Sequence, residues 1–317
     1  MSGIIDVHTH YVPKGWPDLT ADAGPDARGF GSRARPRPSS CWGSKEFRRI
    51  QADAWDAETR LHDMDADGVR TQVVSPTPAF FNYGRTGAQA ERIARIFNDL
   101  ALDIVAPAQD RLIPFCQVPL QDADAACREV ERCVANGHRG VEIGNHVGDR
   151  DLDSEGVVTF LQHCASLDVP VFVHPWDMDS SPRLNRWMAQ WLTAMPAETH
   201  LSILALILGG VFDRIDDRLK IGFRPRRWVL RLLARPDGER LAPPQRRDRH
   251  VRDAAVAYLG RFYVDSVVFD DRALRLLVDT VGVDRVMVGS DYPYPLRERP
   301  VGEVVRKSEF LTRPRGI

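Results

Sequence analysis

The sequence predicts a (β/α)8 barrel of the TIM type, in which short buried strands alternate with helices. Eight segments have the apolar content of buried strands, and most precede a segment with helical spacing of apolar residues. Candidate polar ligands follow three of these strands, at the edge where such barrels carry their sites. A doubly wound sheet is the alternative fold. Residues 1–317 are treated as a single domain, because this length suits one barrel.

In the first half of the chain each element has a local signal. A strand is predicted at residues 4–10, and a helix at 53–70 has Trp55, Leu61 and Met64 at helical spacing. The next elements are a β-branched strand closed by Pro76, a strongly amphipathic helix, an apolar strand, a helix stopped by Gly137 and a fourth strand, predicted at residues 71–75, 87–108, 112–118, 122–135 and 140–143.

The second half of the chain repeats the alternation. A helix at 156–165 precedes an apolar strand at 169–174, and a long helical region at 184–212 is broken near Pro196. The remaining elements are three short apolar strands, at residues 219–223, 262–265 and 285–289, and an amphipathic helix at 271–280.

Composition argues against several classes of function. The net charge is −1, so no overall field favours nucleic acid or anionic membranes. No apolar run of about 18 residues and no signal-peptide core are apparent, so we expect a cytoplasmic protein without a membrane segment. The five cysteines form no CxxC pair and are expected to be reduced thiols; they are Cys41, Cys116, Cys127, Cys133 and Cys164.

Four side chains at predicted strand ends are candidate metal ligands. His8 and His10 are two apart on the first strand and therefore share a face, His174 ends the fifth strand, and Asp291 follows the eighth. In a closed barrel these ends converge near the axis. Three neutral imidazoles and a carboxylate suit Zn²⁺ with a bound water. Surface or core histidines and a helix-capping aspartate are the alternatives, but all four lie at the right strand ends.

Longer strings in the chain resemble the aminocarboxymuconate-semialdehyde decarboxylases of the amidohydrolase superfamily. The resemblance covers residues 1–27, 43–223 and about 252–311. It is carried by the strings His174-Pro175-Trp176-Asp177-Met178, Met195-Pro196-Ala197-Glu198-Thr199, Gln117-Val118-Pro119-Leu120-Gln121-Asp122, Gly144-Asn145-His146, Phe262-Tyr263-Val264-Asp265-Ser266 and Gly289-Ser290-Asp291-Tyr292-Pro293.

The resemblance implies a zinc-dependent, non-oxidative decarboxylation of a small molecule. In this family 2-amino-3-carboxymuconate 6-semialdehyde loses CO2 to give 2-aminomuconate 6-semialdehyde, in tryptophan or nitroaromatic breakdown. It implies zinc on the four candidate ligands, allows a homodimer, and matches Arg48 to an arginine that grips a substrate carboxylate. Trp191 matches an aromatic residue near the site, and His146 is a candidate pocket residue. A surface arginine and core packing of the tryptophan are the alternatives for Arg48 and Trp191.

The chain departs from the family after the sixth strand, where the family reads Phe-x-His-Gly-Gly-Gly. Pro225 stands at the position of the catalytic histidine and cannot transfer a proton, so no catalytic residue is assigned and impaired activity is expected. Residues 28–42 and 224–252 are rich in Arg and Pro and are expected to be irregular. We therefore expect a barrel that is distorted after strand six and truncated at its C-terminus.

A frameshift would explain these windows. Codons for residues 223–229 can be written so that the neighbouring reading frame restores the family motif, and resequencing the gene tests this hypothesis. Sequencing error, gene decay and divergence are the competing explanations. Another decarboxylase or hydrolase of the superfamily and a catalytically dead barrel are the alternative functions, and nucleic-acid binding is the weakest because the chain is neutral overall.

Overall fold

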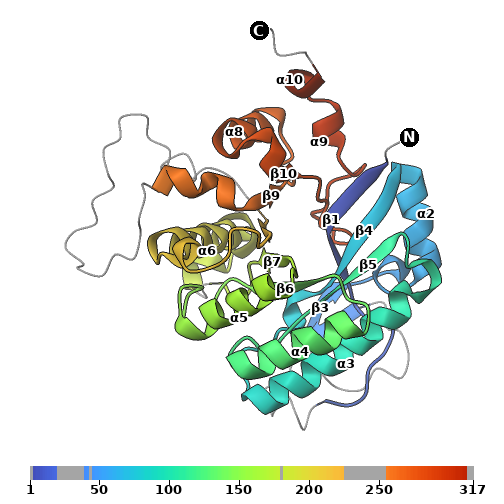
Figure 1. The fold of residues 1–317 in the computed structure, drawn as a ribbon. Helices are drawn as coiled ribbons and strands as arrows, with labels where there is room; N and C mark the ends of the chain where they lie inside the picture. The colour runs from blue at the N-terminus through green and yellow to red at the C-terminus, as the bar shows by residue number, and fades with distance from the viewer. Residues whose placement is uncertain (1–2, 20–38, 43–44, 179–180, 225–254, 313–317) are drawn as a thin grey trace.

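Eight parallel strands form one sheet that curves into a barrel, with helices around the outside (Figure 1). The computed structural model describes residues 3–19, 39–42, 45–178, 181–224 and 255–312. The strand order is β1-β4-β5-β6-β7-β8-β9-β10, and each strand is parallel to its paired neighbour. The strands are β1 (Ile4–Tyr11), β4 (Val69–Pro76), β5 (Leu112–Cys116), β6 (Gly140–Gly144), β7 (Val171–His174), β8 (Ile221–Phe223), β9 (Tyr263–Asp265) and β10 (Val286–Met287).

The barrel closes between β1 and the segment that follows β10. The backbone N–H of His10 donates to the carbonyl of Tyr292 at 2.7 Å, and the N–H of Asp291 donates to the carbonyl of His8 at 2.9 Å. A doubly wound sheet would leave two open edges, so the alternative fold is wrong and the predicted barrel is confirmed. The closure also brings two predicted ligand strands into direct backbone contact.

The predicted helices form, with shifts at their ends. The structure has α2 (Ala57–Asp67), α3 (Gly87–Val105), α4 (Ala123–Ala135), α5 (Glu155–Ser166), α6 (Met195–Leu208), α8 (Asp271–Val281) and the short α9 (Glu303–Arg306) and α10 (Glu309–Thr312).

The helix predicted at 53–70 is too long at both ends. Residues Ala52–Ala54 form a separate 3-10 turn, η1, and the Asp56 side chain caps the start of α2 by accepting from the Thr59 N–H. Gly68 ends α2 in the left-handed conformation, at φ 73°, which glycine adopts without steric cost. Strand β4 therefore begins at Val69, two residues earlier than predicted.

The helical region predicted at 184–212 is divided into several pieces. Two 3-10 turns, η4 (Pro182–Leu184) and η6 (Val211–Asp213), flank a π-helical segment, η5 (Gln190–Ala194), and α6. Pro196 lies in the first turn of α6, where its missing N–H costs nothing. The predicted break near Pro196 is a change from π- to α-helix, because η5 runs directly into α6 with helical dihedrals at Met195.

The stretch Gln190–Leu208, which comprises η5 and α6, is more apolar than the sequence analysis recognised. Among the described residues, Gln190–Leu208 is long and apolar enough to cross a membrane by length and composition. In the structure Ile203, Leu206 and Ile207 of this stretch are buried in the core shared by the barrel strands and the outer helices. A core helix of a globular enzyme shows the same composition, so this stretch is weak grounds for a membrane span.

A two-stranded antiparallel hairpin lies outside the barrel. It pairs β2 (Ser39–Trp42) with β3 (Lys45–Arg49). Residues 39–42 were expected to be irregular, and the hairpin corrects that expectation. Of the other window expected to be irregular, residues 225–252 lie outside the described residues, and so do residues 313–317.

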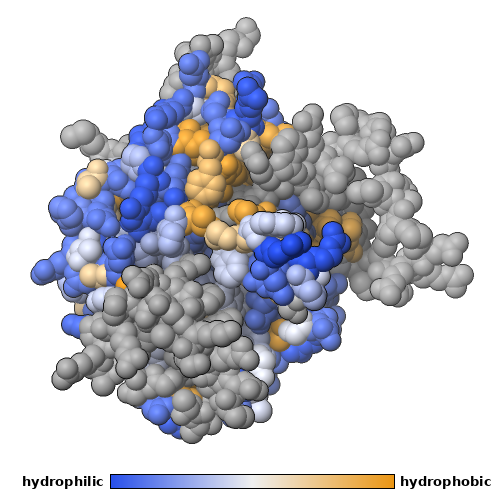
Figure 2. All heavy atoms as spheres, turned by 180° about the vertical axis from the view of Figure 1, so that it is seen from behind, coloured by the Kyte–Doolittle hydropathy of each residue, from blue (hydrophilic) through white to orange (hydrophobic). Residues whose placement is uncertain are grey.

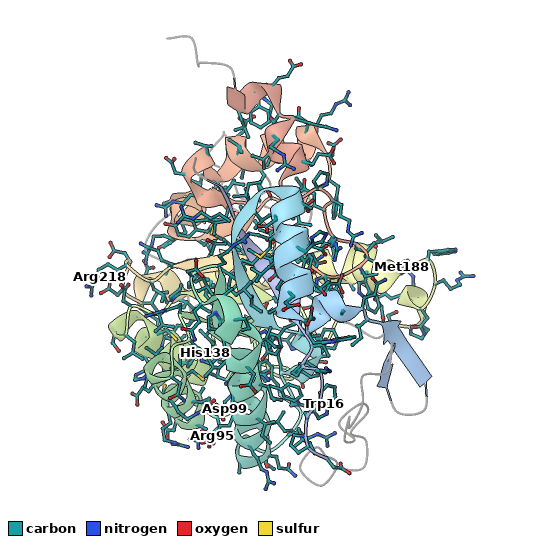
Figure 3. All side chains as sticks on the ribbon, turned by 90° about the vertical axis from the view of Figure 1, so that its right-hand side faces the viewer. Trp16, Arg95, Asp99, His138, Met188 and Arg218 are labelled. Carbon is teal, nitrogen blue, oxygen red and sulfur yellow. The ribbon has the colours of Figure 1, made fainter. Side chains whose placement is uncertain are left out.

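Ion pairs between neighbouring helices hold the outer layer in register. Arg95 and Asp99 lie one turn apart on α3 (Figure 3). Arg95 Nε is 3.3 Å from the buried carboxylate of Glu129 on α4, and Arg132 of α4 donates to Asp99 at 2.7 Å.

On the face in Figure 2 hydrophilic residues surround a smaller hydrophobic area. The distribution is that of a globular barrel with an apolar core and a charged outer layer.

Candidate metal centre

The four predicted ligands converge on one point inside the barrel. His8 and His10 come from β1, His174 from the end of β7, and Asp291 from the segment after β10. One ligand atom from each residue lies within 4.8 Å of the others, and all four side chains are buried. The Nε2 atoms of His8 and His10 are 3.1 Å apart, and Asp291 Oδ1 lies 3.7 and 3.5 Å from them.

Each imidazole is oriented by an acceptor on its other nitrogen. His8 Nδ1 donates to the carboxylate of Asp265 at 2.6 Å, and this pair is fully buried. His10 Nδ1 faces the carbonyl of Pro76 at 3.3 Å, and His174 Nδ1 faces the carbonyl of Pro175 at 3.0 Å. Carbonyl and carboxylate oxygens only accept, so these contacts place the proton on Nδ1 and leave Nε2 with a free lone pair. All three Nε2 atoms can therefore coordinate a metal ion.

The charge states of the site also suit a cation. Burial lowers the pKa of His10 to about 4 and the pKa of His174 well below its usual range, so both rings are neutral at pH 7. Burial opposes ionisation of Asp291, but the Arg224 guanidinium and the neighbouring imidazoles hold the pKa of this carboxyl below its usual range. Nitrogen ligands with one carboxylate fit a divalent transition metal such as Zn²⁺ or Mn²⁺.

Arg224 enters the same site, which the sequence did not predict. Its guanidinium is 3% exposed, and Nη2 donates to Asp291 Oδ2 in a short, charged hydrogen bond. Nη1 lies 3.4 Å from His174 Nε2 and 3.1 Å from Met195 Sδ. Arg224 is the first residue of the window expected to be irregular; it follows β8 without regular secondary structure, and its side chain points into the ligand set.

A second acidic group, Glu142, lies beside the proposed ligands. Glu142 of β6 is fully buried, and neither of its carboxyl oxygens has a hydrogen-bond partner among the described residues. Its Oε1 is 3.8 Å from His10 Nδ1. Burial raises the pKa of Glu142 well above its usual range, which favours its neutral form.

A buried arginine outside the ligand set fixes the position of β1. Arg60 of α2 is fully buried and donates through Nη1 to Thr9 Oγ1 and Gln72 Oε1, both at 3.1 Å. Through Nη2 it donates to the carbonyls of His10 at 2.6 Å and Asp53 at 3.2 Å. One side chain thus joins α2, η1, β1 and β4 directly behind His10.

Asn145 and His146, which belong to a sequence motif shared with the family, hold the loop after His174. Asn145 accepts from the Trp176 N–H at 2.7 Å and donates to the Glu198 carboxylate at 2.6 Å. The Nε2 atom of His146 faces the Asp177 carbonyl at 3.2 Å. His146 therefore supports this loop, and within the described part of the chain its hydrogen bonds and ion pair go to Gly148, Asp177 and Glu198 and not to the proposed metal ligands. Asn145 joins the end of β6 to the segment after β7 and to α6.

The structure gives less detail on Arg48, Trp191 and Pro225, the other residues with predicted roles. Arg48 lies on β3, pairing with Ser40, and its side chain is outside the described part of the chain. Trp191 is half-buried in η5, one turn before the Met195 that contacts Arg224. Pro225 lies outside the described residues.

Two residues of the site, Asp265 and Arg224, were not predicted from the sequence, although each lies at the end of a strand. Asp265 ends β9, so the rule that barrel sites lie at strand ends could have identified it. Arg224 directly follows β8, so the same rule applied to it, but an arginine at the start of an Arg- and Pro-rich stretch is expected to be exposed.

A closed eight-stranded barrel with buried His and Asp ligands at its strand ends defines a class of metal-dependent barrel enzymes. The chain belongs to the amidohydrolase superfamily, whose family model, described as Amidohydrolase, matches residues 5–313. Within it the chain groups with the 2-amino-3-carboxymuconate-6-semialdehyde decarboxylases. It is 33% identical over 317 residues to that enzyme of Dictyostelium discoideum, covering 95% of this chain and 84% of the relative.

Further relatives agree with this placement, and a solved structure shares the fold. The 2-amino-3-carboxymuconate-6-semialdehyde decarboxylase of Caenorhabditis elegans is 29% identical over 96% of this chain and 88% of its own. The gamma-resorcylate decarboxylase of Rhizobium sp. (strain MTP-10005) is 28% identical over 81% of each chain. A dihydroxybenzoic acid decarboxylase structure from Polaromonas sp. JS666, with bound manganese and 2-nitroresorcinol, has a TM-score of 0.73 at 21% identity, over 98% of this chain and 92% of that one. The protein is a carboxy-lyase, a metal-dependent decarboxylase of this superfamily.

Proposed function

We propose that the protein binds Zn²⁺ through His8, His10, His174 and Asp291 and decarboxylates 2-amino-3-carboxymuconate 6-semialdehyde to 2-aminomuconate 6-semialdehyde. The observation that carries the proposal is the convergence of these four buried ligand atoms within 4.8 Å. The similarity to two relatives named for this reaction supports the choice of substrate.

The reaction breaks the bond between a carbon and its carboxylate. The bonding electrons stay on that carbon, CO2 leaves, and one proton must be delivered to the carbon. A divalent metal, when bound, supplies a Lewis acid that stabilises negative charge. Asp265 holds the His8 ring in the tautomer that ligates. Arg48 is proposed to bind a substrate carboxylate, and Trp191 to form part of the pocket wall.

The proton donor is the weak point of the proposed reaction. The related family uses a histidine at the position of Pro225, and proline has no proton to give. General acid–base groups contribute about 10²–10⁴ in rate, so we expect turnover lower by about that factor than in a relative with the histidine. Turnover at the level of such a relative, in protein of this sequence, would contradict this expectation.

The experiment compares metals, substrates and variants. Apoprotein is loaded with Zn²⁺ or Mn²⁺, and decay of the ultraviolet absorbance of the semialdehyde is followed in parallel with release of CO2 from γ-resorcylate. His174→Ala should abolish metal-dependent turnover. His163→Ala should not, because His163 is a half-buried histidine on α5 that pairs with Glu131 away from the site.

Three outcomes decide between the candidate functions. Zinc-dependent decay of the semialdehyde that His174→Ala removes supports the proposal. Turnover of γ-resorcylate alone would assign the chain to the second group of relatives. Stoichiometric zinc without turnover of either compound would overturn the proposed reaction and favour a catalytically dead barrel.

A further inference from the structure

Arg224 places a positive charge inside the set of proposed metal ligands. Its guanidinium lies between His174, at the end of β7, and Asp291, after β10, and the side chain is 3% exposed. We propose that Arg224 is an internal cation that occupies the metal site of the apoprotein and must leave it before a metal ion can bind. Arg224 then acts within the proposed metal centre, on which this inference rests, and independently of the substrate.

The guanidinium contacts one nitrogen that a metal ion would need, His174 Nε2. His174 Nδ1 already faces the carbonyl of Pro175, so Nε2 is the nitrogen left for coordination, and Arg224 Nη1 lies 3.4 Å from it. Arg224 Nη2 donates to Asp291 Oδ2, while Oδ1 faces His8 and His10. A lone pair that accepts a guanidinium proton cannot coordinate a metal at the same time. Arginine and metal therefore compete directly for His174 Nε2, while Asp291 Oδ1 stays free to coordinate beside the guanidinium.

Charge makes the competition stronger. A buried carboxylate such as Asp291 needs a nearby cation, and Arg224 supplies it in the absence of metal. A divalent ion beside a buried guanidinium would be repelled, and the side chain must therefore swing away.

Different contacts hold the main chain and the guanidinium of Arg224. The Arg224 carbonyl accepts from Thr199 Oγ1 at 3.0 Å, which holds the main chain against α6. The guanidinium contacts Asp291, His174 and the thioether of Met195, and its Nε has no hydrogen-bond partner among the described residues. The side chain can therefore leave the site without breaking the contact of the main chain. The apparent metal affinity should then equal the intrinsic affinity reduced by the fraction of molecules with the arginine displaced.

The test measures metal binding without substrate. Apoproteins of the native sequence, Arg224→Met and the control Arg132→Met are titrated with Zn²⁺ against a chromophoric chelator, and with Co²⁺ by visible absorption. Arg132 is a matched control, because it also pairs with a buried carboxylate, that of Glu129, but on the outer helix α4. We expect Arg224→Met to bind Zn²⁺ at least tenfold more tightly than the native protein, and Arg132→Met to bind it equally.

Thermal unfolding gives a second readout. Without metal, Arg224→Met should melt at a lower temperature than the native protein, because Asp291 loses its cation, and saturating Zn²⁺ should raise its melting temperature by more. Equal zinc affinities of the native protein and Arg224→Met would overturn the proposal. If apo Arg224→Met does not fold, the zinc-loaded forms of both proteins are equilibrated with the chelator, and equal partition of zinc overturns it in the same way.

The outcome is separable from the proposed reaction. Tighter zinc binding by Arg224→Met supports the internal cation even if neither substrate is turned over. Equal binding overturns it and leaves the decarboxylation untouched. Absence of zinc binding in both proteins would overturn the metal centre itself and this inference with it.

Discussion

Replacing Arg60 by methionine should destabilise the protein by an amount that can be worked out from its contacts. Arg60 is fully buried and donates four hydrogen bonds, to Thr9, Gln72 and the carbonyls of His10 and Asp53. Methionine can fill much of the same volume but donates none of these bonds. The change therefore removes the connection between α2 and β1 while leaving the apolar packing largely in place.

The expected loss is about 3–5 kcal/mol of unfolding free energy. Each hydrogen bond is worth about 1 kcal/mol net, and a buried acceptor left without a donor adds about 1–3 kcal/mol. Removing a buried charge returns part of this, because burial disfavours the charged form and lowers the pKa of Arg60. The loss of four hydrogen bonds outweighs this gain, since two of the acceptors left unpaired are main-chain carbonyls, that of His10 on β1 and that of Asp53 in η1.

Urea unfolding of the apoprotein, followed by circular dichroism, measures the loss. Arg60→Lys should fall between the native protein and Arg60→Met, because one ammonium cannot reach all four acceptors. Arg275→Met is the control, since Arg275 is exposed and pairs with Asp279 on the surface of α8, where ion pairs contribute about 0–1 kcal/mol. A loss below about 1 kcal/mol for Arg60→Met would refute the reasoning that this side chain fastens β1.

Three more changes have clear expected outcomes. Asp265→Asn should weaken zinc binding about 10–100-fold in a chelator competition, because the residue holds the His8 ring; an unchanged affinity would contradict that role. His138 is buried and its pKa is lowered by burial, so the unfolded chain takes up the proton first as the pH falls below about 6.5. The unfolding free energy should therefore drop there by up to about 1.4 kcal/mol per pH unit. His138→Asn should show a smaller drop between pH 7.5 and 5.5 in urea titrations. Gly140→Ala should cost about 1–3 kcal/mol in the same assay, because its new Cβ would overlap the Phe115 ring, and a neutral effect would mean that the ring moves freely.

The ligand set could be predicted from sequence because its signals are local. A two-residue spacing on a strand fixes the shared face of His8 and His10, and the ends of parallel strands meet at one edge of a barrel. The closure of the barrel then places His174 and Asp291 beside them. None of these steps needs knowledge of how side chains pack.

What the sequence did not reveal depends on packing between distant segments. Arg60 sits on a helix with other charged residues and would be expected to be exposed, yet it is fully buried. Arg224 becomes a site residue only because β8 delivers it beside His174 and Asp291. The C-terminal end of α2 could have been predicted, because Gly68 is a recognisable helix stop. The apolar spacing favoured a longer helix instead.

The exposed loop before α6 was not predicted either. Trp187 and Met188 are 74% and 55% exposed, and Met188 lies at the periphery of the molecule (Figure 3). Both adopt positive φ, at 59° and 54°, where residues with side chains are strained. Apolar periodicity alone extended a helix through these positions, because periodicity does not report backbone strain.

The closure of the barrel between β1 and the segment after β10 has a consequence for how the chain folds. The Ser290 hydroxyl donates to Asp6 at 2.6 Å across 284 positions of sequence, and the contact of His8 with Asp265 spans 257. Ordering such long loops must be completed before these contacts can form, which makes closure a late and slow event. His8 and His10 lie on one side of this seam, Asp291 lies on the other and His174 comes from β7, so a metal ion would bind the closed chain and not its precursors. Zinc added during refolding should therefore stabilise the product without speeding the early steps, and metal uptake would report the moment at which the two ends of the chain meet.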